Sequence, residues 1–261
     1  MILTIDIGNT GTTIGFYKND LLCHPTKISS KPHRSADEYT MLFETLCFQK
    51  GVDKKEVVGC AISSVVPHLT DKTKQAVTAV FSCNPIIITH GIKTGLNIRI
   101  DNHTQLGSDI VADTVAAAVV LEKPFAVIDL GTATTISAVN ATGELIGVII
   151  APGVRLSVDA LSQNAAELPY ISLSEPKALL GKNTEDSMIS GSVYGTAAMI
   201  DGIITRLCEE FGRDYISVIA CGGLAGDVIP FCQTEIEIEP YLTLNGLNHI
   251  YKLNQRKGKS T

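Results

Sequence analysis

A carboxylate, a glycine-containing turn and several hydroxyl side chains stand together near the start of the chain, at residues 6–13. Glycine lets the backbone come close to a phosphate and present its N–H donors. A carboxylate that follows a strand, here Asp6, provides the hard oxygen that hydrated Mg²⁺ prefers. The segment has the parts of a phosphate loop, although a β-hairpin with an Asx turn would use the same residue types. Its residues with a possible binding role are Asp6, Gly8, Asn9, Thr10, Gly11, Thr12 and Thr13.

The same plan returns 123 residues later, at Asp129-Leu130-Gly131-Thr132. A second hairpin of this kind strengthens the phosphate-binding interpretation, because a clamp on two phosphates needs two facing turns. A third element, Cys221-Gly222-Gly223, follows an apolar segment and would allow a flat ligand such as adenine to approach the backbone. Taken alone, a Gly-Gly pair is more typical of a structural turn.

These residues are positioned by an alternation of predicted strands and helices, which favours an α/β sheet with helices on its faces. Ser35 is a predicted N-cap with Glu38 in the capping-box position. The predicted strands are 2–7, 12–17, 57–65, 85–89, 125–130, 135–139, 145–150 and 216–220. The predicted helices are 35–49, 69–81, 109–122 and 187–211.

Two similar halves, each opening with an Asp-bearing hairpin, indicate a duplicated domain with a cleft between the copies. The chain of 261 residues is long enough for two domains. We place the boundary near residue 122, which predicts one domain at 1–121 and the other at 122–261. The basic segment 252–261 lacks an apolar period, so we expect a frayed end, whose role the sequence leaves open.

Composition excludes several classes of function. The net charge is −6, aromatic residues make up 5% and tryptophan is absent, so we expect no nucleic-acid partner. The apolar runs are interrupted too early to predict a membrane span. The seven cysteines include no C-x-x-C pair, which argues against a zinc site and a disulfide framework. Together with the absence of a signal-peptide pattern, this predicts a cytoplasmic protein.

Taken in this order, the three glycine-containing elements resemble the actin/hexokinase/Hsp70 type of ATPase, and neither the P-loop nor the Rossmann pattern is present. Over almost its whole length the chain also resembles the type III pantothenate kinases. The matching segments are Asp6-x-Gly8-Asn9-Thr10, residues 63–67, Thr94-Gly95-Leu96, Gly107-x-Asp109, Asp129-x-Gly131-Thr132-Ala133, Ala151-Pro152-Gly153, Leu168-Pro169, Asn183-Thr184, Ser190-Gly191, Gly195, residues 222–225 and Leu242-Thr243-Leu244-x-Gly246-Leu247.

This resemblance implies two related actin-like (ribonuclease H-like) α/β domains with a nucleotide cleft between them, and a homodimer. It also implies ATP-dependent phosphorylation of pantothenate, the first step of coenzyme A biosynthesis, with Mg²⁺ and a monovalent cation, K⁺ or NH₄⁺. Carried over by position, residues 6–13 would hold the ATP phosphates, with Asp6 near Mg²⁺. Thr132, Gly222 and Gly223 would also bind the nucleotide.

For the acceptor, the resemblance makes Asp109 the base that takes the proton of the attacking hydroxyl. Asp129 would bind the monovalent cation. A carboxylate suits the base role, because phosphoryl transfer depends mostly on positioning and on neutralising charge. The remaining substrate contacts implied are Gly107, Ser108, Ile100, Ile110 and Thr184.

Two of these positions depart from the family pattern. Ile110 stands where the family usually has Arg, and Ile100 where it often has Tyr, so neither side chain can supply the hydrogen bonds of its counterpart. Arg99 and Arg155 are candidates to compensate, although either would more commonly be a solvated surface charge. Two alternatives therefore remain at the level of sequence: a kinase for another small hydroxylated acceptor, and a non-catalytic ATP-binding paralogue.

Overall fold

The computed structural model describes residues 1–255, which form two compact units. The first unit contains residues 1–95, 101–116 and 242–255. The second contains residues 96–100 and 117–241. Each unit is built on its own β-sheet, so we describe them one at a time.

The first unit has a five-stranded sheet in the order β3-β2-β1-β4-β5. The hairpin β1-β2 is antiparallel, and β4 pairs in parallel with the other edge of β1. The central strands are short, apolar and β-branched, as expected for strands covered on both faces. The strands are β1 (Ile2–Ile7), β2 (Gly11–Lys18), β3 (Leu21–Ser29), β4 (Gly59–Ser64) and β5 (Ile86–Ile87).

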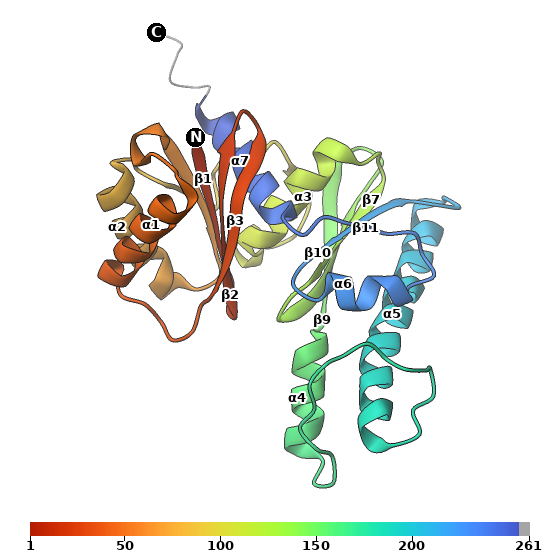
Figure 1. Cartoon of the computed structure of the whole chain (residues 1–261). Helices are drawn as coiled ribbons and strands as arrows, with labels where there is room; N and C mark the ends of the chain where they lie inside the picture. The colour runs from red at the N-terminus through yellow and green to blue at the C-terminus, as the bar shows by residue number, and fades with distance from the viewer. Residues whose placement is uncertain (256–261) are drawn as a thin grey trace. The chain divides into compact units, whose positions relative to one another are not determined.

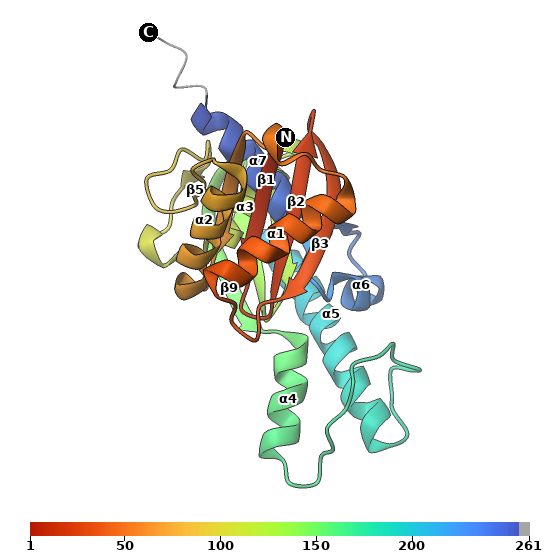
Figure 2. The same ribbon diagram turned by 60° about the vertical axis from the view of Figure 1, so that its left-hand side comes forward.

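Helices cover both faces of this sheet. α1 and α2 lie side by side on one face, and α7 packs on the other against β1 and β4 (Figures 1 and 2). The core under α1 and α2 contains Ile5, Phe16, Tyr39 and Phe43, all of which are inaccessible or nearly so. The helical segments of this unit are α1 (Ala36–Lys50), η1 (Lys54–Glu56), α2 (Pro67–Phe81), η2 (His103–Gln105), most of α3 (Ser108–Val120) and α7 (Leu242–Gln255).

The second unit has a six-stranded sheet in the order β11-β10-β7-β8-β9-β6. α5 packs its buried residues Ile200, Ile204 and Leu207 into the core of this unit. α4 lies against the N-terminal part of α5, and both extend beyond the end of the sheet (Figures 1 and 2). The elements are β6 (Asn97–Ile98), β7 (Phe125–Leu130), β8 (Ala133–Val139), β9 (Glu144–Pro152), α4 (Val154–Asn164), α5 (Thr184–Phe211), β10 (Ser217–Cys221), α6 (Ala225–Val228), η3 (Ile229–Phe231) and β11 (Glu237–Ile238).

The two sheets share one topology. In each, the first strand forms an antiparallel meander with the next two and pairs in parallel with a fourth, so β1, β2, β3 and β4 correspond to β7, β8, β9 and β10. The sequence repeat at Asp6 and Asp129 is therefore a structural repeat. The α/β class predicted from the sequence is confirmed, and β6 is an addition at the edge of the second sheet.

The predicted strands and helices all occur, with ends displaced by a few residues. The capping box at Ser35 and Glu38 is present, since each side chain accepts a hydrogen bond from the other residue's backbone N–H. Sequence reasoning missed β3, α4 and α7. It also assigned 252–261 to a frayed end, whereas residues 252–255 belong to α7, and the rest of that segment lies outside the described residues.

The division into units differs from the predicted boundary in three segments, one of which, 117–121, was predicted in the first domain and belongs to the second unit. The prediction put 242–261 in the second domain, but the apolar stripe of α7 is buried on the first unit's sheet, with Leu247 and Ile250 inaccessible. The segment 96–100 joins the second unit because β6 pairs with β9. The assignments of 96–100 and of α7 both depend on contacts between residues far apart in the sequence. No helix within residues 1–255 is long and apolar enough to cross a membrane.

Candidate active site

A row of polar side chains crosses the first unit's sheet. In the strand register, Lys27 of β3 lies opposite Thr13 of β2, Thr13 opposite Asp6 of β1, and Asp6 beside Ser63 of β4. Register partners point to the same face, so these four side chains share one face of the sheet. Ile5 and Ile7 point the other way, into the core under α1 and α2. The carboxylate of Asp6 thus stands in a polar line at the end of an apolar strand.

The turn between β1 and β2 is closed by a hydrogen bond from the Gly8 N–H to the Gly11 carbonyl oxygen, at 2.9 Å. Asn9 and Thr10 at its tip are exposed, and Thr13 is half-buried. Thr12 differs from the expectation that it offers a side-chain donor to a ligand. It is inaccessible to solvent, and its hydroxyl lies 2.9 Å from that of buried Ser30. Alternation along β2 turns Thr12 toward the core.

The N-terminus of α3 is tied to the end of β4. The Ser108 hydroxyl accepts a hydrogen bond from the Ser64 N–H at 3.0 Å and lies 3.0 Å from the Ser63 hydroxyl. Ser63 is itself the register partner of Asp6. Ser63 therefore lies beside Asp6 in the sheet and contacts the sequence-predicted Ser108 through its hydroxyl.

Asp109 follows as the second residue of α3 and is half-buried. One carboxylate oxygen accepts a hydrogen bond from the Ile110 N–H at 2.8 Å. A side chain at Gly107 would collide with this carboxylate, which explains the glycine in the Gly-x-Asp motif. Burial raises the pKa of the Asp109 carboxyl, while hydrogen bonds from the backbone N–H groups of Ile110 and of Asp109 itself oppose that rise.

The second unit repeats this arrangement around Asp129. In the register, Asp129 lies opposite Thr135 and beside Cys221. Gly222 has φ +95°, and a Cβ there would collide with the Asp129 carboxylate, so this position requires glycine. A Cβ at Gly153 would meet the carbonyl oxygens of Gly131 and Thr132.

Of the predicted nucleotide residues in this unit, Thr132 is exposed at the tip of the turn between β7 and β8. Gly223 follows Gly222 in the segment that leads from β10 to α6. This segment is fixed by a hydrogen bond of 3.1 Å from the Leu224 N–H to the Leu130 carbonyl oxygen. The second unit therefore brings Asp129, Thr132, Gly222 and Gly223 to one end of its sheet.

Thr184 lies apart from these residues, at the first position of α5. Its neighbour Asn183 caps the helix, accepting a hydrogen bond from the Asp186 N–H at 2.8 Å. The exposed side chain of Thr184 lines a cavity of about 890 Å³ between α4, the N-terminal part of α5 and the segment that joins them. The predicted N-terminal start of this helix at Ser187 was one turn late.

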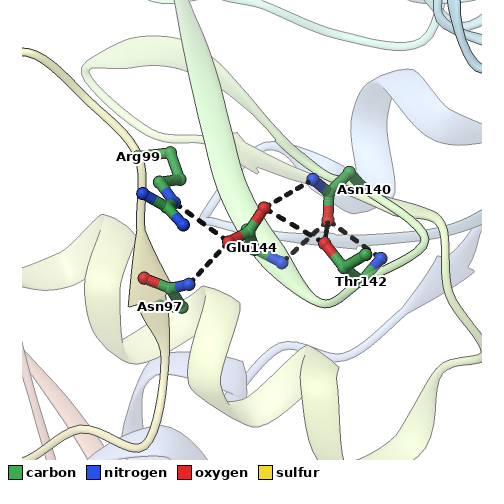
Figure 3. A network of polar contacts seen from close by, with 5 residues as sticks. All are labelled: Asn97, Arg99, Asn140, Thr142 and Glu144. Atoms are coloured by element: carbon green, nitrogen blue, oxygen red, sulfur yellow. Dashed lines mark hydrogen bonds and ion pairs between the residues drawn. The ribbon is translucent and has the colours of Figure 1, made fainter.

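The two isoleucines that depart from the family pattern have different surroundings. Ile110 is buried, with 9% of its surface exposed, and Ile100 is half-buried at the end of the segment that carries β6. That segment is fixed by Glu144, which accepts hydrogen bonds from Asn97 at 2.6 Å and Arg99 at 2.9 Å (Figure 3). The guanidinium of Arg99 is therefore engaged in an ion pair. Arg155 is exposed on α4.

Residues 1–255 contain no group of three His, Cys, Asp or Glu side chains placed to hold a metal ion by themselves. The oxygen donors around Asp6 nevertheless suit Mg²⁺, which is commonly held by one or two carboxylates together with water and substrate phosphates. Asp6 and Thr13 present only oxygen atoms on their shared face, whereas Ser63 is inaccessible to solvent. The Asp129 carboxylate likewise provides oxygen ligands suited to a monovalent cation.

Comparison with known proteins assigns the family. The family model for type III pantothenate kinase matches residues 2–206. A type III pantothenate kinase from an Exiguobacterium species is 40% identical over 256 residues, covering 98% of this chain and all of the relative. The chain belongs to the type III pantothenate kinase family. It is therefore a small-molecule kinase, and the alternative of a non-catalytic paralogue is not favoured.

Solved structures similar to this kinase share its fold at low sequence identity. A protein from Campylobacter jejuni described as a Baf family transcriptional activator has a TM-score of 0.60 at 17% identity, covering 97% of this chain and 99% of its own. A protein from Sinorhizobium meliloti described as a 2-dehydro-3-deoxygalactonokinase has a TM-score of 0.58 at 9% identity, with both chains covered completely. These likenesses support the actin-like fold and carry no argument about substrate.

Proposed function

We propose that this kinase transfers the terminal phosphoryl group of ATP to the primary hydroxyl of pantothenate, giving 4′-phosphopantothenate for coenzyme A biosynthesis. Family membership supports the reaction. The observation that best supports the site is the link between Asp6 and Asp109. Ser63 lies beside Asp6 in the sheet, and its hydroxyl contacts Ser108, the residue before Asp109. A phosphate-loop carboxylate and a basic carboxylate are thereby held in one unit.

In this proposal Asp109 accepts the proton of the attacking hydroxyl. A carboxyl whose pKa is raised by burial is a stronger base than an ordinary aspartate. Gly107 makes room for its carboxylate, and Ser108 anchors the first turn of α3 to β4. The proton leaves as the oxygen bonds to phosphorus, so positioning matters more than basicity.

The nucleotide is assigned to the residues that the family resemblance implies. Residues 6–13 hold the phosphates, through backbone N–H groups of the turn and the side chains of Asn9, Thr10 and Thr13. Mg²⁺ held near Asp6 would neutralise phosphate charge when bound. In the second unit, Thr132, Gly222 and Gly223 contact the nucleotide, and Asp129 holds K⁺ or NH₄⁺.

The acceptor is assigned to Gly107, Ser108, Ile110, Ile100 and Thr184. Since Ile110 is buried, it contributes an apolar wall in place of a charged hydrogen-bond donor. Thr184 offers a hydroxyl on the wall of its cavity. This predicts a pantothenate site that depends on shape and neutral hydrogen bonds more than on an arginine contact.

We further propose that the kinase is a homodimer. Large apolar side chains are exposed on the second unit near α4, and exposed apolar surface of this kind commonly marks a protein–protein interface. They include Tyr170 at 74% and Leu180 at 80% exposure. A second copy of the chain, related by a two-fold axis, would cover these residues in both subunits. A cytoplasmic location, expected from the sequence, stays a prediction.

The activity is tested by coupling ADP release to an optical readout with pantothenate, Mg²⁺ and K⁺ present. We expect turnover that depends on pantothenate and on both cations, and a product that mass spectrometry identifies as phosphopantothenate. Omitting K⁺, or replacing it by Na⁺, should lower the rate. A folded chain that binds ATP but releases no ADP at millimolar pantothenate would refute the proposed acceptor, and a panel of other small alcohols would then be screened.

A further inference from the structure

We propose that the end of β3 forms a second wall of the phosphate site, with Ser30 fixing the shape of the turn at residues 8–12 and Lys27 supplying positive charge to the ATP phosphates. This inference rests on the proposed role of residues 6–13 in binding ATP. It adds two residues that the sequence did not single out. Ser30 acts as a positioning residue, whereas Lys27 would contact the substrate.

Ser30 is bonded to the turn at three points. Its N–H donates to the Thr10 carbonyl oxygen at 3.0 Å, and its hydroxyl donates to the Gly8 carbonyl oxygen at 2.7 Å. The Thr12 hydroxyl lies 2.9 Å away. Because the single hydroxyl proton of Ser30 is used on Gly8, Thr12 must be the donor in this pair. Ser30 is 1% exposed and Thr12 is inaccessible, so water cannot replace these bonds.

These hydrogen bonds matter for anion binding because they hold backbone carbonyl oxygens of the turn. A carbonyl oxygen that faces a phosphate repels it, so a phosphate-binding turn has to direct its carbonyls away from the ligand and its N–H groups toward it. Ser30 donates hydrogen bonds to the carbonyl oxygens of both Gly8 and Thr10 and so holds them in place. Fixing them before the ligand arrives removes a reorganisation that binding would otherwise have to drive.

The second unit supports this interpretation. Residue 30 comes directly after β3, and Gly153 comes directly after β9, the strand that corresponds to β3. Gly153 packs against the carbonyl oxygens of Gly131 and Thr132, in the turn that corresponds to residues 8–11. The residue after the third strand therefore braces the first turn in both units, through a hydroxyl in one and through close backbone contact in the other.

Lys27 is placed by the strand register at the outer end of the polar row. It lies two strands from Asp6, roughly 10 Å between Cα atoms at about 4.8 Å per strand. Its side chain is exposed and runs along the turn, since a Cβ added at Gly11 would lie 3.1 Å from its Cε atom. A lysine side chain in this position can bring its ammonium group to a phosphate held by the turn.

The positive charge of Lys27 matters because its surroundings are acidic. The chain carries a net charge of −6, and the neighbouring row and helix present Asp6 and Asp109. A polyanionic ligand needs a local cation in such surroundings. The corresponding row of the second unit has Ile150 opposite Thr135, so the lysine is present in one copy of the repeat only. The terminal phosphates of ATP would therefore be held by the first unit.

The test measures binding of the non-hydrolysable ATP analogue AMP-PNP, with Mg²⁺ and K⁺, to the full chain by calorimetry. We expect Lys27→Gln to weaken binding about 10-fold, in the range for losing a hydrogen bond to a charged group. The loss should appear for AMP-PNP and ADP, be absent for AMP, and reduce the salt dependence of binding. Lys74→Gln, on exposed α2 surface, is the matched control and should bind as the wild type does.

Ser30→Ala should weaken AMP-PNP binding about 5-fold or more and raise the KM for ATP, leaving the KM for pantothenate unchanged. Amide hydrogen exchange in residues 8–12 should become faster. The control is Ser29→Ala, because the exposed hydroxyl of Ser29 bonds only locally, to Lys31 at 2.6 Å. If Ser30→Ala does not fold, Thr12→Val removes one of the same bonds with little change of shape and should give a smaller loss.

Two outcomes would overturn the inference. The first is an AMP-PNP affinity of Lys27→Gln within twofold of that of Lys74→Gln. The second is an AMP-PNP affinity of Ser30→Ala and Thr12→Val equal to that of Ser29→Ala. Both measurements omit the acceptor, so they are independent of the proposed substrate. A chain that shows the expected binding losses but does not phosphorylate pantothenate would refute the proposed acceptor and leave the second wall in place.

Discussion

Asp109 is subject to two opposing effects. It lies in the first turn of α3, where the helix dipole and backbone N–H groups favour a negative charge. Burial disfavours that charge and has the larger effect, so the pKa of its carboxyl is raised. The net shift gives this carboxylate a higher affinity for a proton than an ordinary aspartate has, which suits the role of a base.

Replacing Asp109 by Asn tests this role. We expect kcat to fall by at least about 100-fold, which is the usual contribution of a general base, with AMP-PNP affinity nearly unchanged. Stability should not decrease, because the asparagine removes a buried charge whose ionisation is unfavourable in the folded state. Steady-state kinetics, calorimetry and thermal unfolding of the same preparation measure these three quantities. Activity equal to that of the wild type would remove Asp109 from the base role.

The pH dependence of the reaction follows from the direction of the same shift. The base must be ionised, so kcat/KM should fall as pH decreases through the Asp109 pKa, at a value above the ordinary aspartate pKa of about 3.9. A raised folded-state pKa has the opposite effect on stability: its contribution is present at low pH and is lost as pH rises through that pKa. An acid limb at or below the ordinary value would contradict the shift.

At the scale of elements, glycines set how closely strands, turns and helices can approach. In the first unit, α7 crosses α3 at Gly246, where a Cβ would collide with the backbone of Ala112. This contact packs the C-terminal helix against the helix that carries Asp109. The family motif that contains Gly246 therefore has a structural explanation that its position in the sequence did not suggest.

Gly246→Ala should consequently destabilise the protein. The added methyl group meets backbone atoms, which cannot move aside as a side chain can, so we expect a loss of about 1–3 kcal/mol in the free energy of unfolding. Urea unfolding followed by circular dichroism measures it. Gly226→Ala on α6 is the control, since a Cβ there meets nothing within 4 Å and should be neutral or stabilising. Equal stability of the two variants would contradict the close crossing.

At the scale of the whole molecule, local patterns predicted the repeated central strands and missed what lies at their edges. β1 and β7 are apolar runs that lead into an Asp-x-Gly turn, and the predicted bounds of both strands are confirmed to the residue. β3 has no such signal, because it contains Pro25 and its residues are all exposed or half-buried, so it lacks a continuous apolar run. α7 contains Gly246 and several asparagines, which lower helix propensity.

The site residues, too, could be predicted only where local sequence patterns indicate them. The carboxylates and glycines were recognised because their residue types and their spacing along the sequence are enough to indicate phosphate binding. Lys27 and Ser30 were not, because their relation to the turn is created by strand register, which a sequence does not display. Likewise, the assignment of α7 to the first unit depends on packing between residues about 190 positions apart, such as Tyr251 against Gly59.

The proposed dimer is the prediction that concerns the whole molecule. Leu180, 80% exposed beside the cavity lined by Thr184, should be buried by the second copy. Leu180→Asp would place two charges in a symmetric interface, one from each subunit. The substitution therefore weakens the affinity between the subunits at two places. We expect the mass measured by light scattering to fall from twice 27.8 kDa to 27.8 kDa. Leu21→Asp, at a residue of the first unit with 72% exposure, is the control and should remain dimeric. A Leu180→Asp protein that keeps the mass of the wild type would place the subunit contact elsewhere.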